Sequence, residues 1–184
     1  MAFHAVNNAL DIVKAMRIQD NIGAATTYLN CATVYKAFGR AKDAMPLFER
    51  AQHIYEEQLP ENDPRFGGLY NNMALALVDL CRFQEAYTLY DKAIALNTDD
   101  RILDTAITYL NIASAKEAEL GLEDGEEFIA ELLNKAMKIL DDYSLRNGYY
   151  AFVCEKCASV FGYYGYFVYK NELLKRARAI YERS

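Results

Sequence analysis

An internal repeat constrains the fold of this chain more than any other feature of its sequence. The segment Tyr28-Leu29-Asn30-Cys31-Ala32 returns as Tyr70-Asn71-Asn72-Met73-Ala74 and then as Tyr109-Leu110-Asn111-Ile112-Ala113, at offsets of 42 and 39 residues. A weaker fourth copy runs from Cys154 to Ala158 and lacks the asparagine. Self-similarity at such a period indicates supersecondary units that cannot bury their apolar faces alone and must stack.

Each copy places small and large residues at helical spacings. Ala32, Ala74 and Ala158 are each followed 19 residues later by another alanine, whereas Ala113 and Ala136 are 23 residues apart. Large side chains stand three residues before each second alanine, at Phe48, Tyr90, Leu133 and Leu174. Small residues let two helices approach closely and large ones fill the groove beside them. The repeat unit is therefore predicted to be a helix hairpin.

The turns inside the hairpins have their own signal. Gly39 and Gly165 stand where a left-handed backbone conformation is needed, and Cys81 occupies the same place in the second copy. The four extra residues of the third copy fall in the stretch 121–127. Its acidic part, residues 123–127, is predicted to be a solvated loop before a helix N-terminus, where carboxylates are favourable.

Taken together, the repeat positions resemble the tetratricopeptide (TPR) repeat. The copy that matches best consists of Tyr28, Ala32, Tyr35, Gly39, Ala44, Phe48 and Ala51. The long repeat and the connector 59–64 are similar to the kinesin light chain subgroup, which is also widespread in bacteria, so the resemblance implies a bacterial source. The implied fold is an all-α, right-handed superhelical α-solenoid of antiparallel helix pairs. Departures from the pattern, at Lys116, Ile129 and Lys170, predict less regular packing in the last two hairpins.

We expect a single solenoid domain over residues 1–184. It would contain a half repeat at 2–18, the second helix of a pair, and repeats at 22–59, 66–97, 103–141 and 149–183. Terminal repeats of solenoids usually carry a polar capping surface. No such cap is evident here, so we expect either a piece of a longer protein or ends that a neighbouring chain covers.

Three equivalent asparagines, Asn30, Asn72 and Asn111, are the leading candidates for ligand contact. A side-chain amide both donates and accepts, so a row of amides can hold an extended peptide by its backbone, and the resemblance assigns them this role. The alternative is that they make interhelical hydrogen bonds that fix the stacking of repeats. Flanking positions expected on the same face are Thr33, Lys36, Leu75, Asp79, Ser114, Glu117, Lys156, Ser159 and Tyr163.

Composition and motifs narrow the possible partners. A formal charge of −6 disfavours nucleic acid and anionic membranes, which reward clustered basic residues. Four cysteines without a secretory signal favour a reduced, cytoplasmic setting.

Cys154 and Cys157 coincide with core positions, and a structural zinc site would need two more ligands. Neither a phosphate-binding loop nor a nucleophile with a base is present, so we expect neither an enzyme nor a cofactor.

The sequence therefore predicts a scaffold or adaptor that binds an extended peptide in a concave groove. The alternative is a peptide-sensing regulatory module of a larger signalling or transcription-regulating protein. Six of the fifteen tyrosines lie in the fourth repeat, at 149, 150, 163, 164, 166 and 169. Aromatic clusters often anchor interfaces. We expect this end to pack against another copy of the chain or a missing helix, with core filling as the alternative.

Overall fold

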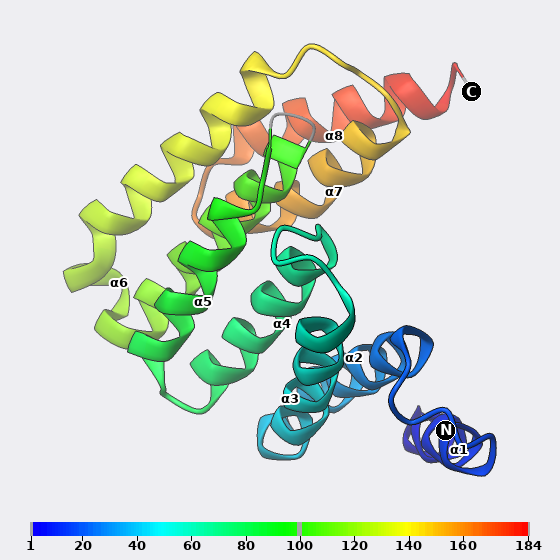
Figure 1. The fold of residues 1–184 in the computed structure, drawn as a ribbon. Coiled ribbons are helices and arrows are strands. Elements are labelled where there is room, and N and C mark those ends of the chain that lie inside the picture. The colour runs from blue at the N-terminus through cyan, green and yellow to red at the C-terminus, as the bar shows by residue number, and fades with distance from the viewer. Residues whose placement is uncertain (1, 99–100, 184) are drawn as a thin grey trace. The chain divides into compact units, whose positions relative to one another are not determined.

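The computed structural model describes residues 2–98 and 101–183 as a succession of α-helices, with no strand among these residues. The all-helical class predicted from the repeats is confirmed. Contacts within the chain divide it into two compact units, one that extends to Leu96 and one that begins at Asn97 (Figure 1). The single-domain organisation stays a prediction.

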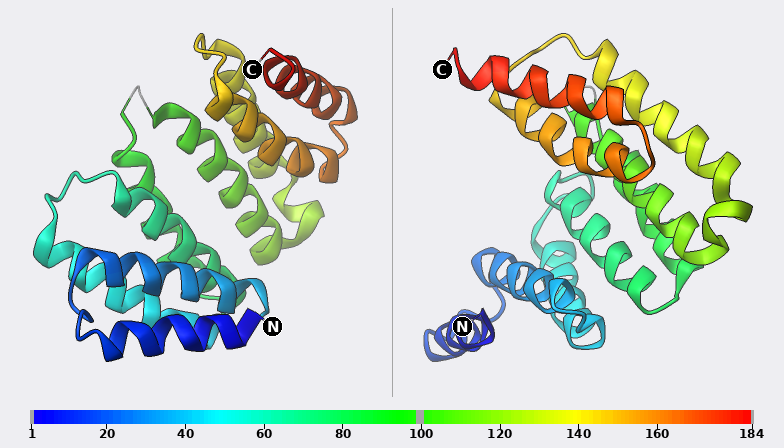
Figure 2. Two further views of the ribbon diagram at one scale, coloured as in Figure 1. Left: turned by 90° about the vertical axis from the view of Figure 1, so that its right-hand side faces the viewer. Right: turned by 180° about the vertical axis from the view of Figure 1, so that it is seen from behind.

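The first unit is a row of helices in which each packs against the next. They are α1 (Ala2–Ala15), α2 (Ile22–Ala37), α3 (Ala41–Gln58), α4 (Arg65–Asp79) and α5 (Phe83–Ala95). In addition, α2 lies directly against α4. Figure 2 shows α1, α2 and α3 side by side with alternating directions. The helices α2 and α4 are thus the first helices of two hairpins, and α3 and α5 are the second helices.

The half repeat predicted at 2–18 forms α1, but this helix ends three residues earlier than expected. Arg17 adopts a left-handed conformation, with φ of 54°. The Ile18 amide donates to the Val13 carbonyl at 3.3 Å, which closes the end of the helix. Arginine rarely adopts positive φ, so this helix end could not be predicted from the sequence.

The second unit contains α6 (Ile102–Asp142), α7 (Gly148–Tyr163) and α8 (Phe167–Tyr181). Gly121, with φ of 81° and ψ of 173°, breaks α6 into a first part, residues 102–120, and a second part, residues 122–142. The two parts run in opposite directions (Figure 1). The solvated loop predicted for residues 123–127 is wrong, because these residues form the first turns of the second part of α6. The insertion therefore lengthens a helix rather than a loop.

All hairpin turns contain one residue in a left-handed conformation, as predicted for Gly39, Cys81 and Gly165. Their φ angles are 70°, 58° and 84°. Around Cys81, its own amide donates to the Val78 carbonyl and the Arg82 amide donates to the Leu77 carbonyl, both at 2.9 Å. The same two bonds recur around Gly39 and Gly165. This pattern satisfies the last carbonyls of the first helix and fixes the direction of the second.

Replacing Cys81 with glycine should raise the free energy of unfolding by about 1 kcal/mol, because an L-residue in the left-handed region costs about 1–2 kcal/mol. The reverse substitution, Gly39→Ala, should lower it by about the same amount, since a Cβ at Gly39 would meet no atom within 4 Å and only the backbone term remains. Urea unfolding followed by circular dichroism measures both. A destabilised Cys81→Gly variant would contradict this account of the turn.

The small and large repeat positions form the cores of the hairpins. None of the eight repeat alanines is more than 1% exposed: Ala32, Ala51, Ala74, Ala93, Ala113, Ala136, Ala158 and Ala177. Phe48, Tyr90 and Leu133 are buried between them, as predicted. The prediction that Leu174 fills the core is wrong, because Leu174 is 37% exposed and Leu173 is fully buried in its place. In α8 the large residue precedes the alanine by four positions, which is equally compatible with one helix face.

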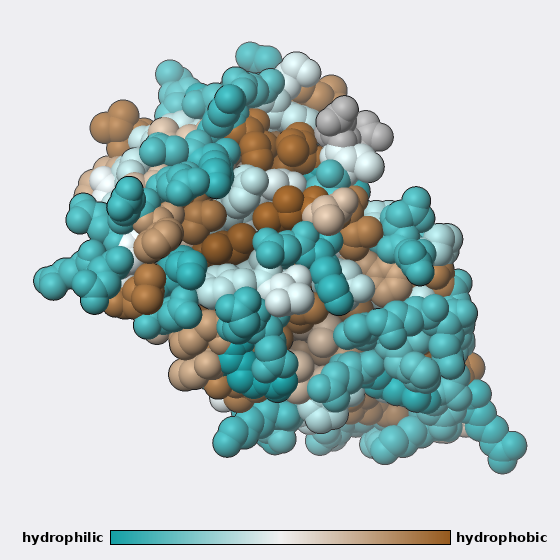
Figure 3. Space-filling model, turned by 60° about the vertical axis from the view of Figure 1, so that its left-hand side comes forward, coloured by the Kyte–Doolittle hydropathy of each residue, from teal (hydrophilic) through white to brown (hydrophobic). Residues whose placement is uncertain are grey.

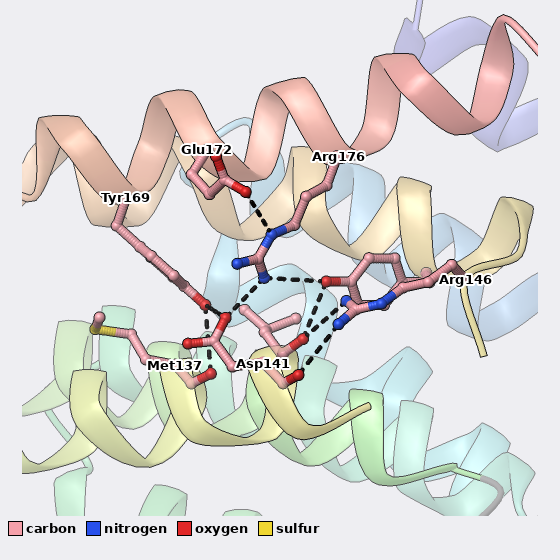
Figure 4. A network of polar contacts seen from close by, with 8 residues as sticks. Met137, Asp141, Arg146, Tyr169, Glu172 and Arg176 are labelled. Carbon is pink, nitrogen blue, oxygen red and sulfur yellow. Dashed lines mark hydrogen bonds and ion pairs between the residues drawn. The ribbon is translucent and has the colours of Figure 1, made fainter. Parts of the chain in front are cut away.

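A polar network joins α6, α7 and α8 at one end of the second unit (Figure 4). Arg176 donates to Asp141 at 2.7 Å, to Glu172 at 3.1 Å and to the Tyr150 hydroxyl at 3.2 Å. Tyr169 donates to Asp141 at 3.0 Å, and Tyr150 donates to the Leu140 carbonyl at the same distance. The guanidinium of Arg146 covers the Tyr150 ring at 4.2 Å. Tyrosines of the fourth repeat therefore contribute to the internal packing of this unit.

Candidate functional site

The predicted contact residues of the first unit share one face, formed by α2 and α4. Asn30 and Thr33 on α2, and Asn72 and Leu75 on α4, are separated by three positions and lie at least partly accessible to solvent. We call this surface the α2–α4 face, defined by Asn30, Thr33, Lys36, Asn72, Leu75 and Asp79. Because α2 contacts α4, the first helices of two successive repeats are neighbours there.

Two polar groups of the α2–α4 face bond within their own helices. The Asn72 amide donates to the Gly68 carbonyl at 2.8 Å, and the Thr33 hydroxyl donates to the Leu29 carbonyl at 2.9 Å. These bonds orient the side chains and leave the Asn72 carbonyl oxygen able to accept. Asn30 is exposed on α2. The Asn72–Gly68 bond lies within α4. It is therefore not the interhelical hydrogen bond that was considered as the alternative role of the amides.

Lys36 and Asp79, predicted only as flanking positions, form an ion pair between α2 and α4. The Lys36 Nζ lies 3.6 Å from the Asp79 Oδ2, and the two side chains are 28% and 38% exposed. A pair this accessible contributes at most about 1 kcal/mol to stability. It does compensate the two charges at one end of the face, so a ligand there meets little net charge.

The predicted residues of the second unit lie on two first helices, with Asn111 and Ser114 on the first part of α6 and Lys156 on α7. Ser114 and Lys156 are exposed and Asn111 is half-buried. The Ser114 hydroxyl donates to the Leu110 carbonyl at 3.3 Å, within its own helix. The Lys156 ammonium lies 6.0 Å from the centre of the Phe152 ring. We call this surface the α6–α7 face, defined by Asn111, Ser114, Phe152, Lys156 and Tyr163.

Hydrogen bonds between tyrosines and carboxylates join these two helices at both ends. Tyr149 donates to Asp104, and both Tyr163 and Tyr164 donate to Glu117, the latter at 2.8 Å. Burial and the acceptance of these bonds by carboxylates raise the pKa of Tyr149 and Tyr164 above the usual tyrosine value. The hydroxyls therefore stay protonated and keep donating throughout the neutral pH range.

Exposed aromatic rings distinguish the α6–α7 face from the α2–α4 face. Tyr149 is 43% exposed, Phe152 is 50% exposed and Tyr163 is 67% exposed. They follow one another along α7 at spacings that place them on a single side of the helix. Figure 3 shows how apolar residues gather in patches between polar ones on the molecular face that it presents. Accessible aromatic side chains of this kind are common anchors at protein interfaces.

Glu117 and Tyr163 were predicted as flanking positions, whereas Phe152 and Asp104 were not predicted from the sequence. A helical projection of residues 148–163 would have placed Phe152 on the side of Lys156 and Tyr163. The pairing of Asp104 with Tyr149 had no comparable signal, since the two residues are 45 positions apart and belong to a repeat of irregular length.

The two cysteines of the fourth repeat are core residues, as predicted. Cys154 and Cys157 are at most 1% exposed and belong to the apolar core of the second unit. Burial raises the pKa of Cys154 to about 11 and that of Cys157 to about 12. A protonated, buried thiol is a poor nucleophile and a poor metal ligand. Among the described residues, no group of three or more His, Cys, Asp or Glu side chains could hold a metal ion.

Tyrosines of the fourth repeat divide between the interior and the surface. Tyr150 is fully buried, Tyr164 and Tyr169 are half-buried and hydrogen-bonded, and Tyr163 is exposed. Some tyrosines therefore fill the core, and others are accessible for contact with another chain. Association of copies through this repeat stays a prediction. Within the described part of the chain, no helix is both long enough and apolar enough to cross a membrane.

Comparisons with known proteins identify the fold. No protein-family model and no curated protein matches the sequence. Two similar solved structures are crystal structures of nearly identical TPR-like repeats of a kinesin light chain from Podosopora anserina, one of them with a single substitution. Their TM-scores are 0.62 and 0.64, at 18% and 19% identity. The alignments cover 99% and 100% of this chain and 88% and 89% of those chains. The chain therefore has the TPR-like helical-repeat fold predicted from its sequence.

Proposed function

We propose that this chain of TPR-like hairpins is a protein-interaction scaffold that binds extended peptide segments on the faces of its first helices. One observation carries the proposal: accessible amide and hydroxyl side chains lie on first helices that contact each other. Repeat folds present such surfaces already formed, which reduces the ordering cost of binding. The function requires no catalytic group and no cofactor.

The α2–α4 face has the chemistry to hold a peptide backbone. Asn30 and Asn72 stand at equivalent positions on adjacent helices, so their amides can bond peptide groups about two to three residues apart along an extended segment. Leu75 is half-buried beside Asn72 and offers an apolar contact. Backbone recognition by amides gives affinity that depends little on the ligand's sequence, and such contacts are common in peptide binding.

The α6–α7 face would supply the side-chain selectivity. Phe152 and Tyr163 are accessible rings that can bury apolar side chains of a ligand. Burial of apolar area contributes about 25 cal/mol per Å². Lys156 stands beside Phe152 and could add an ionic contact. We therefore expect peptides selected by this face to contain apolar or aromatic residues.

A reduced, cytoplasmic setting fits this function. All four cysteines are free thiols, and three of them are buried. Structural disulfides are the usual form of paired cysteines in oxidising compartments. We propose the cytoplasm as the location and a protein, rather than a nucleic acid, as the partner, because the formal net charge is −6.

Selection from an unbiased peptide library tests the proposal. Wild-type protein should enrich a peptide class, and a variant with Asn30→Ala, Asn72→Ala and Asn111→Ala should bind the enriched peptides at least about tenfold more weakly, because each lost hydrogen bond contributes about 0.5–1.5 kcal/mol. A matched control with Asn7→Ala, Asn8→Ala and Asn134→Ala removes three exposed amides from other helices. Equal losses in the two variants, or no enrichment by folded wild type, would refute the proposal.

A further inference from the structure

The second unit contains an open hollow that the proposed peptide-binding faces do not explain. It has a volume of about 640 Å³. One wall is the second part of α6, through Leu122, Glu123 and Glu126. The opposite wall is the turn between α7 and α8, through Tyr163, Tyr164 and Tyr166. The hollow thus combines carboxylates on one side with aromatic rings on the other.

Local structure places the two carboxylates together. The break at Gly121 starts a new helix, and Glu123 and Glu126, three positions apart, lie on the same side of its first turns. Ile129 and Leu133 continue this side as a buried apolar floor. The insertion that lengthens the third repeat is what brings the two glutamates to the hollow.

No ion pair within the described residues compensates Glu123 or Glu126. The ammonium of Lys116, which lies 5.7 Å from the centre of the Phe128 ring, pairs with Glu119 at 3.0 Å. Both glutamates of the hollow are exposed. The acidic wall is therefore open to a ligand of opposite charge.

The aromatic wall is held in place by its own contacts. Glu117 accepts hydrogen bonds from both Tyr163 and Tyr164, whose rings meet edge to face with centres 5.0 Å apart. Tyr166 meets the buried ring of Phe161 at 6.0 Å. Rings fixed in this way can receive a flat or cationic group without a large ordering cost.

We propose that this hollow binds an arginine side chain presented by a partner polypeptide. The methylene stem would lie on Leu122 and the apolar floor, and the guanidinium would donate to Glu123 and Glu126 and stack on a tyrosine ring. A purely apolar occupant would bury two carboxylates without a partner, which costs free energy, and an anion would be repelled.

The two glutamates of this site are not part of the peptide-binding faces. Glu123 and Glu126 belong to a second helix, whereas the proposed peptide contacts belong to first helices. Tyr163 alone borders both surfaces. Loss of binding in a variant of the two glutamates would therefore leave the amide-dependent interaction measurable, and the two proposals can fail separately.

The probe is the peptide acetyl-Ala-Leu-Arg-Leu-Ala-amide, titrated to millimolar concentration into the full chain and followed by backbone amide chemical shifts. Its counterpart replaces arginine with citrulline, which has nearly the same shape and no charge. Saturable shifts in residues 122–133 and 163–166 are expected with the arginine peptide. Citrulline should weaken binding at least about tenfold, as expected for a lost charge-assisted interaction.

A pair of charge-matched variants completes the test. The double variant Glu123→Gln, Glu126→Gln should bind the arginine peptide at least about tenfold more weakly. Asp124→Asn with Glu127→Gln removes the same charge from the same helix outside the hollow and should leave the affinity within about twofold. Equal affinity for the two peptides, no saturable binding of the arginine peptide by wild type, or equal losses in both variants would overturn the proposal. The comparison of peptides on the wild type decides the matter even if a variant does not fold.

Discussion

Replacing Phe161 with alanine is expected to lower the free energy of unfolding of the second unit by about 3–5 kcal/mol. Phe161 is fully buried in the core of this unit. Its ring meets Tyr169 edge to face, with centres 4.8 Å apart, and Tyr166 at 6.0 Å. Truncation would remove these contacts and leave a cavity that helices held by the neighbouring polar network cannot easily close.

Urea denaturation with near-ultraviolet circular dichroism measures this change, and hydrogen exchange assigns it to residues 97–184. Phe167→Ala is the matched control, because Phe167 is the same residue type and is 63% exposed. Its effect should stay within about 0.5 kcal/mol. A loss below about 1 kcal/mol for Phe161→Ala, or equal losses for both variants, would contradict the assignment of Phe161 to the core.

The complementary change, Ala74→Leu in α4, should destabilise the first unit by about 1–3 kcal/mol. Ala74 is fully buried at a repeat position where helices approach closely. Extra methylene groups there force neighbouring side chains out of their rotamers or push the helices apart. The expected result is an earlier urea midpoint and loss of protection from hydrogen exchange in α4 and the helices packed against it.

Ala37→Leu provides the control for this substitution. Ala37 lies in α2 of the same unit and is exposed. Leucine and alanine have similar helix propensities, so the exposed substitution should change stability by less than about 0.5 kcal/mol. If leucine were tolerated equally at both positions, Ala74 would not mark a close helix contact.

The repeat pattern predicted the local rules of this fold well, because those rules depend on single residues. A left-handed turn needs glycine or a strained substitute, and Cys81 occupies such a turn with φ of 58°. Close helix contact needs a small residue, and the repeat alanines are buried accordingly. Both requirements can be read from spacing alone.

Predictions failed where neighbouring residues satisfy the same rule. Leu173 and Leu174 are both leucines within one turn of Ala177, so spacing could not select which of them is buried. The acidic run at 123–127 suits a loop by its charge, but glutamate also has a high helix propensity. The chain extends the helix there, and its carboxylates lie near the favourable N-terminus.

For the candidate site, the sequence predicted positions on helix faces but not the contacts between them. Asn30 and Asn72 could be placed by the repeat offset, since each repeat position has an equivalent in the next copy. The Lys36–Asp79 pair and the bonds of Glu117 to Tyr163 and Tyr164 depend on the distances between adjacent helices. Such distances depend on packing, which no single repeat specifies.

We propose that ligands bind to the first helices of the hairpins. Backbone amide chemical-shift mapping with a peptide enriched by the wild-type protein tests this proposal. We predict shifts concentrated in α2, α4, the first part of α6 and α7, and strongly reduced in the Asn30→Ala, Asn72→Ala, Asn111→Ala variant. Saturable shifts confined to α3, α5 and α8, with the first helices unchanged, would contradict it.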